Sequence, residues 1–233
     1  MQKKQCSLSV VIPCYNEKNT IEMIVDKVRE VPIETLEIIV IDNVSTDGTR
    51  DILKERIAPK VSKIIYNETN VGKSGSVRKG IAAATADMVV IQDADMEYNP
   101  VADFPRLVQP IIDDEADVVY GSRFANKGHS RGKIANYLGN RLFTWYSNLW
   151  TGFKLTDMET CYKVFKRDII QNITLVENGF GFEPEVTGKI AATGCRVTEI
   201  PIEYHPRTAE EGKKVRFTDG IHTLKCIYRY RNG

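Results

Sequence analysis

Apolar and polar positions alternate in blocks along the first half of the chain, and the blocks change period regularly. Short runs rich in Val and Ile are typical of buried strands, whereas apolar positions three and four residues apart are typical of helices. Strands are expected at 8–12, 36–41, 61–66, 88–92 and 117–120. Helices are expected at 17–30, 47–58, 73–84 and 101–112. This repetition predicts an α/β fold with a doubly wound, mostly parallel sheet.

The pattern is less regular after residue 120. We expect helices at 134–150, 184–193 and 217–230, and strands at 162–165 and 197–204. Loops are expected at 124–133, which carries Gly and Arg, and at 205–215, which is polar. No repeat and no linker-like composition divides the chain, so the sequence predicts one domain over residues 1–233.

Asp93 and Asp95 follow the apolar run 88–91, with Gln92 between the run and Asp93. A strand that is apolar on both faces is typical of a buried parallel sheet, and open α/β sheets bind ligands beyond the carboxyl ends of their strands. Two carboxylates this close repel each other unless a divalent cation neutralises them. We therefore expect a hard cation here that grips a diphosphate, with a solvated turn as the alternative.

Polar residues follow the other expected strands as well. They lie in the segments 13–17, 42–49, 67–73, 93–97 and 121–123. Because the carboxyl ends of parallel strands meet at one edge, we expect these segments to converge on one crevice. Asp42 is suited to a hydrogen bond with a ribose or a base, and Asp47 is suited to capping the next helix.

Two common phosphate-binding motifs are excluded. The segment 70–74 resembles a phosphate-binding loop, but Asn67 stands where that loop requires Gly. No G-x-G-x-x-G follows any expected strand, so a dinucleotide-binding domain is not expected.

Composition narrows the classes of function. The net charge of +1 gives no overall field that would attract nucleic acid. The five cysteines are scattered without a C-x-x-C pair, and the three histidines are far apart, so neither a disulfide framework nor a zinc site is expected. We find no signal peptide and no run of about 18 apolar residues. The sequence predicts a cytoplasmic protein whose membrane attachment, if any, is peripheral.

In their order along the chain, these segments resemble glycosyltransferase family 2, which has the GT-A fold. The matching segments are 10–17, 42–49, Asn70-x-Gly72-Lys73, Asp93-Ala94-Asp95, Gly121-Ser122-Arg123 and Asp157-x-x-Thr160-x-Tyr162-Lys163, which together cover about residues 7–205. Within the family, 93–97 and 180–185 resemble the polyprenyl- and dolichyl-phosphate sugar synthases. The resemblance implies that about 7–120 binds the nucleotide-sugar and that about 121–233, with the C-terminal helix, binds the acceptor.

The resemblance also implies roles for individual residues. A UDP- or GDP-sugar would be bound by Pro13, Tyr15, Glu17, Asp42, Lys73, Asp93, Ala94, Asp95 and Arg123. Mg²⁺ or Mn²⁺ would be bound by Asp93, Asp95 and Glu97. Phosphates of the acceptor would be bound by Arg131, Arg207, Lys213 and Arg216. The chain departs from the family at Asn43, where Asp is usual, which weakens the expectation that position 43 binds the base as an acceptor-only group.

The implied reaction is an inverting displacement at an anomeric carbon, in which the cation neutralises the departing nucleoside diphosphate. Arg123 would assist as a phosphate-binding catalytic group. A hydroxyl acceptor needs a general base, for which we expect Asp157 first, Glu183 second and Glu185 third. As alternatives, Asp157 ties down its loop and Glu185 interacts with a helix dipole.

The acceptor is expected to be a polyprenyl phosphate, with a saccharide or protein hydroxyl as the alternative. A lipid phosphate is already ionised and needs little help from a base. For this acceptor we expect the basic loop 205–216 to close as a lid over the site, whereas the alternative is a solvated loop.

Phe217, Ile221, Leu224 and Tyr228 fall on one face of the expected terminal helix, with basic residues nearby. Such a helix can lie on an anionic membrane, but an apolar stripe is more typical of a core, and we expect this one to be buried.

Two other classes of function remain as alternatives. A sugar nucleotidyltransferase would need a Gly-rich basic loop after the first strand, where this chain has the acidic segment 13–17. A non-catalytic nucleotide-sugar binding module is disfavoured by the joint presence of Asp93, Asp95, Arg123 and Asp157. No linear motif specifies the sugar, the base or the oligomeric state.

Overall fold

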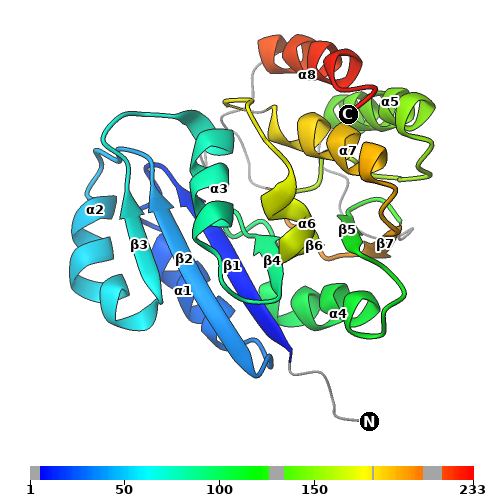
Figure 1. The fold of residues 1–233 in the computed structure, drawn as a ribbon. Helices are drawn as coiled ribbons and strands as arrows, with labels where there is room; N and C mark the ends of the chain where they lie inside the picture. Colours follow the sequence, from blue (N-terminus) through cyan, green and yellow to red (C-terminus); the bar gives the residue numbers. More distant parts are fainter. Residues whose placement is uncertain (1–5, 126–133, 180, 207–216) are drawn as a thin grey trace.

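The structure, a computed structural model, describes residues 6–125, 134–179, 181–206 and 217–233. Its centre is a seven-stranded sheet with the order β3-β2-β1-β4-β6-β5-β7 (Figure 1). The strands are β1 (Ser7–Cys14), β2 (Thr35–Asp42), β3 (Lys63–Tyr66), β4 (Met88–Ile91), β5 (Val118–Ser122), β6 (Lys163–Lys166) and β7 (Val197–Pro201). Strand β6 is antiparallel to its neighbours β4 and β5, and the other pairs are parallel. The predicted α/β fold with a mostly parallel sheet is confirmed.

The helices are α1 (Ile21–Arg29), α2 (Thr49–Ile52), α3 (Gly72–Ala83), α4 (Pro100–Ile112), α5 (Ile134–Thr151), α6 (Arg167–Asn172), α7 (Phe182–Thr193) and α8 (Phe217–Arg229). Helix α6 was not expected from the sequence, and two of the expected helices depart most from their predicted form. Helix α1 begins at Ile21 rather than at Glu17, because residues 17–20 form a turn in which Thr20 donates to the Glu17 carbonyl. The helix expected at 47–58 continues after α2 as a π-helical turn (Leu53–Ile57) and a 3₁₀ turn (Ala58–Lys60) at Pro59, which lacks the N–H needed to extend an α-helix.

Helices α1 and α3 lie on opposite faces of the sheet (Figure 1). Strand β4 is buried along its whole length, and most of β1 and β2 is buried with it. Gly80 allows α3 to lie directly on these strands, because a Cβ at that position would collide with Val11 and Ile41. The β1–β2–β4 edge is therefore held by continuous apolar packing.

Helices α5, α7 and α8 pack on one another and lie together at the top of Figure 1. The buried face of α8 carries Thr223, Cys226 and Ile227, whereas Ile221 is 47% exposed and Tyr228 is 52% exposed. Of the predicted stripe, Leu224 is half-buried and the side chain of Phe217 lies outside the described residues. The expectation that the stripe is buried is wrong for Ile221 and Tyr228, because α8 packs on the rest of the molecule through the adjacent face of the helix. No helix in the described part of the chain combines the length and apolarity needed to cross a bilayer.

Candidate active site at the carboxyl ends of the strands

The loops after β1 and β2 are joined by hydrogen bonds. Asn16 N donates to Ser45 Oγ at 3.0 Å, Thr46 N donates to Asn16 Oδ1 at 2.8 Å, and Glu17 N donates to Thr49 Oγ1 at 3.0 Å. Asn16 and Val44 have positive φ angles of 55° and 64°, and a β-branched residue rarely adopts this conformation. Such strained residues cluster at functional sites, where the surroundings fix the backbone.

Asp42 lies at the end of β2 and is fully buried. Its carboxylate accepts hydrogen bonds from Val44 N at 3.2 Å, from Ser45 N at 3.2 Å and from Arg50 Nε at 2.5 Å. These contacts use the carboxylate to form the turn after β2, so the geometry favours this role over the predicted direct contact with a ribose or base. Asp47 accepts from Thr49 N at 3.0 Å, although Gly48 occupies the N-cap position of α2.

Asn43 connects the end of β2 to the loop that precedes α3. Its Oδ1 accepts from Val71 N at 3.0 Å, and its Nδ2 donates to Asn70 Oδ1 at 2.8 Å. Because Asn70 Oδ1 also accepts from Gly72 N at 3.0 Å, position 43 must supply a donor here. A carboxylate cannot do so, which gives a physical reason for Asn instead of Asp.

The other donor-binding candidates of β1 lie at the same edge. Pro13 is half-buried within β1, Tyr15 is 39% exposed, and Glu17 is half-buried, where its carboxylate accepts from Thr20 Oγ1 at 2.9 Å. Their contact with a donor stays a prediction.

Asp93, Ala94, Asp95 and Glu97 form a tight turn after β4. Ala94 is buried, and the three acidic residues are half-buried. Glu97 N lies 3.3 Å from Asp95 Oδ1, and Met96 between them has a positive φ of 64°. The turn therefore presents oxygen ligands only, which is the donor set that Mg²⁺ and Mn²⁺ prefer.

Lys73 joins this turn to α7. Its Nζ lies 2.9 Å from Asp93 Oδ1 and 3.5 Å from Glu183 Oε1. Burial acts against the ammonium charge, but the nearby Asp93 and Glu183 carboxylates outweigh it, so the pKa of Lys73 lies above its usual value. The structure thus brings together three predicted site residues that lie up to about a hundred residues apart in sequence.

The first turn of α3 is positioned by Gly72, whose φ is +72°. A Cβ on Gly72 would lie 2.5 Å from the backbone nitrogen of Gly179, and Ser74 N donates to the Gly179 carbonyl at 3.1 Å. Asn178 and Gly179 therefore lie directly against the helix end that carries Lys73.

Arg123 and Asp157 form a buried, bidentate ion pair. Arg123 Nε lies 2.7 Å from Asp157 Oδ2, Arg123 Nη2 lies 2.7 Å from Oδ1, and Arg123 N donates to Oδ2 at 3.0 Å. Asp157 is fully buried. Because both carboxylate oxygens of Asp157 already accept hydrogen bonds from Arg123, the geometry favours the loop-fixing role of Asp157 over the predicted role of general base.

The other two carboxylates considered as bases differ from each other. Glu185 is fully buried, and its oxygens accept from Val176 N at 2.7 Å, Glu177 N at 2.8 Å and Lys189 Nζ at 2.7 Å. Glu185 therefore holds the segment before α7. Glu183 lies in the first turn of α7 beside Lys73, with 8% of its side chain exposed.

Glu159 is a site residue that the sequence interpretation missed. Its Oε1 is buried and has no hydrogen-bond partner within the described residues. Burial, and next the charge of Glu183, raise the pKa of Glu159 to about 8. Nearby Lys163 is fully buried, and burial lowers its pKa. The only signal in the sequence was an acidic residue inside the motif between Asp157 and Thr160.

Tyr204 links Arg123 to the acidic turn. Its hydroxyl donates to Glu97 Oε2 at 3.1 Å, and its ring centre lies 5.2 Å from the guanidinium carbon of Arg123. His205 N donates to the Glu97 carbonyl at 2.8 Å. The segment after β7 is thereby fixed along residues 97–98. The predicted acceptor residues Arg131, Arg207, Lys213 and Arg216, with most of the expected lid, lie outside the described residues.

Comparison with known proteins gives consistent matches. Residues 9–174 match the family described as Glycosyl transferase family 2. The undecaprenyl-phosphate mannosyltransferase of Micrococcus luteus is 30% identical over 215 residues, which cover 87% of this chain and 85% of that protein. Glycosyltransferase AglJ of Haloferax volcanii is 29% identical over 202 residues, which cover 86% of this chain and 64% of that protein.

Solved structures show the same fold. Glucosyl-3-phosphoglycerate synthase from Mycobacterium tuberculosis, in complex with Mn²⁺, UDP-glucose and phosphoglyceric acid, matches with a TM-score of 0.72 at 20% identity. The match covers 97% of this chain and 80% of the other. The architecture at the carboxyl ends of the strands is therefore that of the GT-A fold.

Proposed function

The chain belongs to glycosyl transferase family 2, and we propose that it transfers a hexose from a UDP- or GDP-sugar to a polyprenyl phosphate at a membrane face. Membership of this family makes it a nucleotide-sugar-dependent glycosyltransferase. The finer proposal concerns the donor, the cation and the acceptor, and it rests on the geometry of the described residues. The relative from Micrococcus luteus, whose name gives undecaprenyl phosphate as its acceptor, supports it.

The donor lies at the β1–β2–β4 edge in this proposal, so residues 7–120 form the donor-binding half and 121–233 the acceptor-binding half. Pro13, Tyr15, Glu17 and Ala94 line the donor site. Asp93, Asp95 and Glu97 hold Mg²⁺ or Mn²⁺, which when bound neutralises charge on the leaving diphosphate.

The remaining site residues position one another and the substrates. Lys73 carries a positive charge between Asp93 and Glu183, where it orients the Asp93 carboxylate and is suited to a phosphate oxygen. Asp157 holds Arg123 in a fixed orientation, and Arg123 steadies phosphate at the end of β5. Of the three predicted bases, Glu183 is best placed to accept a proton if the acceptor is a hydroxyl compound.

The observation that carries the acceptor assignment is an apolar surface on α5. Leu138, Leu142, Trp145 and Leu149 follow a helical spacing, and each is between 52% and 59% exposed. A groove of about 630 Å³ lies between this stripe and α8, with Lys225 and Arg229 among its lining residues. Monomeric soluble proteins rarely expose contiguous apolar patches of this kind, and basic side chains beside one suit anionic lipid headgroups.

The test measures metal-dependent release of UDP or GDP from a panel of sugar donors, with and without a short polyprenyl phosphate in anionic vesicles. We expect one donor to be released much faster when the lipid phosphate is present. In the double variant Leu142→Ser/Trp145→Ser, vesicle binding and lipid stimulation should fall at least about tenfold. The reason is that losing roughly 1.4 kcal/mol of binding free energy from apolar burial lowers the affinity for the vesicle tenfold. The rate at which the double variant releases UDP or GDP without lipid should stay unchanged.

The matched control is Met23→Ser, which removes a side chain that is 50% exposed on α1, away from the stripe. It should leave vesicle binding unchanged. If lipid phosphate does not stimulate release with any donor, the lipid acceptor is rejected, and saccharides or protein hydroxyls become the acceptors to test with Glu183→Gln. If no donor is turned over in the presence of Mg²⁺ or Mn²⁺, the donor assignment also fails.

A further inference from the structure

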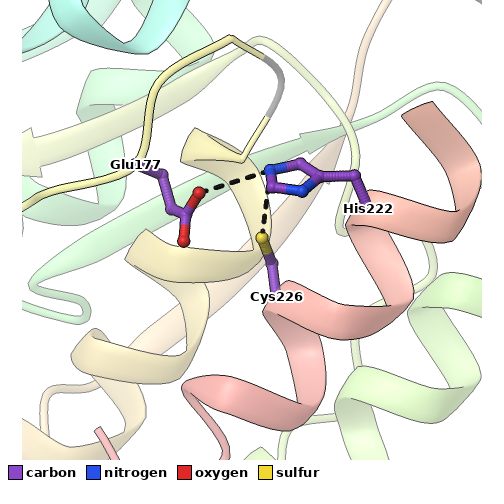
Figure 2. A group of neighbouring side chains, drawn as sticks. All are labelled: Glu177, His222 and Cys226. Carbon is purple, nitrogen blue, oxygen red and sulfur yellow. Dashed lines mark hydrogen bonds and ion pairs between the residues drawn. The ribbon is translucent and has the colours of Figure 1, made fainter. Parts of the chain in front are cut away.

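Glu177, His222 and Cys226 meet where α8 packs against the segment before α7 (Figure 2). His222 and Cys226 are one turn apart on α8, and Glu177 lies between α6 and α7. His222 Nε2 lies 3.3 Å from Glu177 Oε2 and 3.4 Å from Cys226 Sγ. One ligand atom from each residue lies within 4.8 Å of the other two. Sequence spacing gave no sign of this cluster, because 45 residues separate Glu177 from His222.

We propose that Glu177, His222 and Cys226 bind a Zn²⁺ ion. Imidazole nitrogen, thiolate sulfur and carboxylate oxygen are the three ligand types that zinc takes in proteins. With bonds of about 2.0 to 2.3 Å in tetrahedral geometry, neighbouring ligand atoms lie about 3.3 to 3.6 Å apart. The two measured contacts of His222 Nε2 are close to this spacing, so an ion fits with small side-chain adjustments and release of the Cys226 proton.

The contacts around the cluster orient Glu177 for this role. Its Oε1 accepts from Arg229 Nη1 at 2.7 Å and from the Tyr230 hydroxyl at 2.8 Å, which leaves Oε2 directed at His222. Outer-shell hydrogen bonds of this kind fix ligating side chains in metal sites. Glu177 and Cys226 are buried, whereas 44% of the His222 side chain is exposed. Solvent therefore reaches the cluster from the His222 side, where a water can serve as the fourth ligand.

A bound ion would connect α8 to the donor edge. Arg78 of α3 donates to the Glu177 carbonyl, and its Nη2 donates to Asn178 Oδ1 at 3.0 Å. Gly179 then contacts the first turn of α3, next to Lys73. The site is chemically distinct from the acidic turn at Asp93–Glu97, because sulfur and nitrogen ligands favour zinc over Mg²⁺ or Mn²⁺. Its role is to fix α8, and it goes beyond the proposed transferase reaction.

The test uses the full chain freed of metal by a chelator and titrated with Co²⁺, whose spectrum reports ligands and geometry. We expect one equivalent to produce a thiolate-to-cobalt absorption band and the visible bands of a tetrahedral ion, and we expect Zn²⁺ to abolish both. Zn²⁺ should also raise the midpoint of thermal unfolding, because it binds the folded state. His222→Gln should weaken binding by about 10- to 100-fold or more, by analogy with losses at metal sites.

Cys226→Ala should abolish the thiolate band, whereas the matched control Cys195→Ala, at a half-buried cysteine outside the cluster, should retain it. Asp95→Asn should retain it as well, which separates this site from the acidic turn. A folded wild-type protein without the band, or a band unchanged by His222→Gln, would overturn the proposal. The exposed His222 side chain keeps that variant informative even if the Cys226 variant does not fold.

Discussion

Along the ends of β1 and β2, polar side chains are fixed mainly by hydrogen bonds between neighbouring loops, to which Asp42 and Arg50 add one ion pair. Beyond β5 the site residues are mostly buried ions. Asn16 and Asn43 typify the first region, in which most bonds join a side chain to a backbone N–H. Arg123, Asp157 and Lys163 typify the second, in which charges are enclosed by protein. The two regions meet at Lys73, between Asp93 and Glu183.

This difference has energetic consequences. One intramolecular hydrogen bond contributes about 1 kcal/mol net to stability. Removing one partner of a buried ion pair costs about 3–5 kcal/mol, because the other charge is left without compensation. Damage to the second region should therefore appear first as unfolding, and damage to the first as altered donor binding.

The largest effect is expected for Arg123→Ala. It leaves the fully buried Asp157 carboxylate without its ion pair and should lower the free energy of unfolding by about 3–5 kcal/mol, measured by urea denaturation. Replacing both partners, as Arg123→Met with Asp157→Leu, should recover much of this loss while activity stays absent. If the double variant is no more stable than Arg123→Ala, the buried-charge account is wrong.

The acidic turn should show the opposite behaviour. Asp95→Asn should reduce kcat/KM on the order of 100-fold, as for the loss of one electrostatic contact to a transition state, with a change in stability below about 1 kcal/mol. Steady-state kinetics over a Mg²⁺ and Mn²⁺ series measure this, and higher metal should restore part of the rate. The control Asp51→Asn, on the exposed surface of α2, should match wild type. Full activity in Asp95→Asn would remove Asp95 from the proposed metal set.

The contrast between the regions also marks how far the sequence could be interpreted. Strand period and parallel topology were enough to place Asp93 and Asp95 at the carboxyl end of a buried strand, because that inference needs only the local pattern. Helix α6, with six residues, is too short to show a helical period. The pairing of Arg123 with Asp157, and the face of α8 that is buried, depend on contacts between distant side chains, which no local pattern specifies.

A smaller, pH-dependent effect is expected at Glu159. The folded pKa of about 8 exceeds the usual 4.5, so between these values the folded state holds a proton that the unfolded state has lost. Stability should therefore fall as pH rises through this window, by up to about 1.4 kcal/mol per pH unit, and level off above it. Lys163, Arg123, Asp157 and Glu183 are the charged groups that influence this titration.

Glu159→Gln removes this titration. Denaturant unfolding at pH 5, 6, 7 and 8 measures the free energy of unfolding of both proteins. Relative to wild type, the variant should become more stable as pH rises, by about 2 kcal/mol at pH 8 once relaxation of the site is allowed for. Glu68→Gln, at an exposed position, serves as the control, and its free energy of unfolding should change with pH in the same way as that of wild type. Parallel curves for Glu159→Gln itself would mean that Glu159 is ionised at neutral pH in the folded protein.

The smallest effect is expected for Asn43→Asp, which introduces the residue that the family resemblance implies at this position. The new carboxylate would still accept from Val71 N, but it would face Asn70 Oδ1, which already accepts from Gly72 N. We expect a loss of about 1 kcal/mol at pH 7 and a raised KM for the donor, because the loop leads into the helix end that carries Lys73. The contact between two acceptors raises the pKa of the new carboxyl group, so the loss should grow with pH and vanish below about pH 4, where the protonated acid can donate.

Asn232→Asp, at an exposed position, controls for the added charge. An Asn43→Asp variant with unchanged stability and KM would show that this loop adapts to either residue, and that hydrogen bonds between the loops do not set the donor edge.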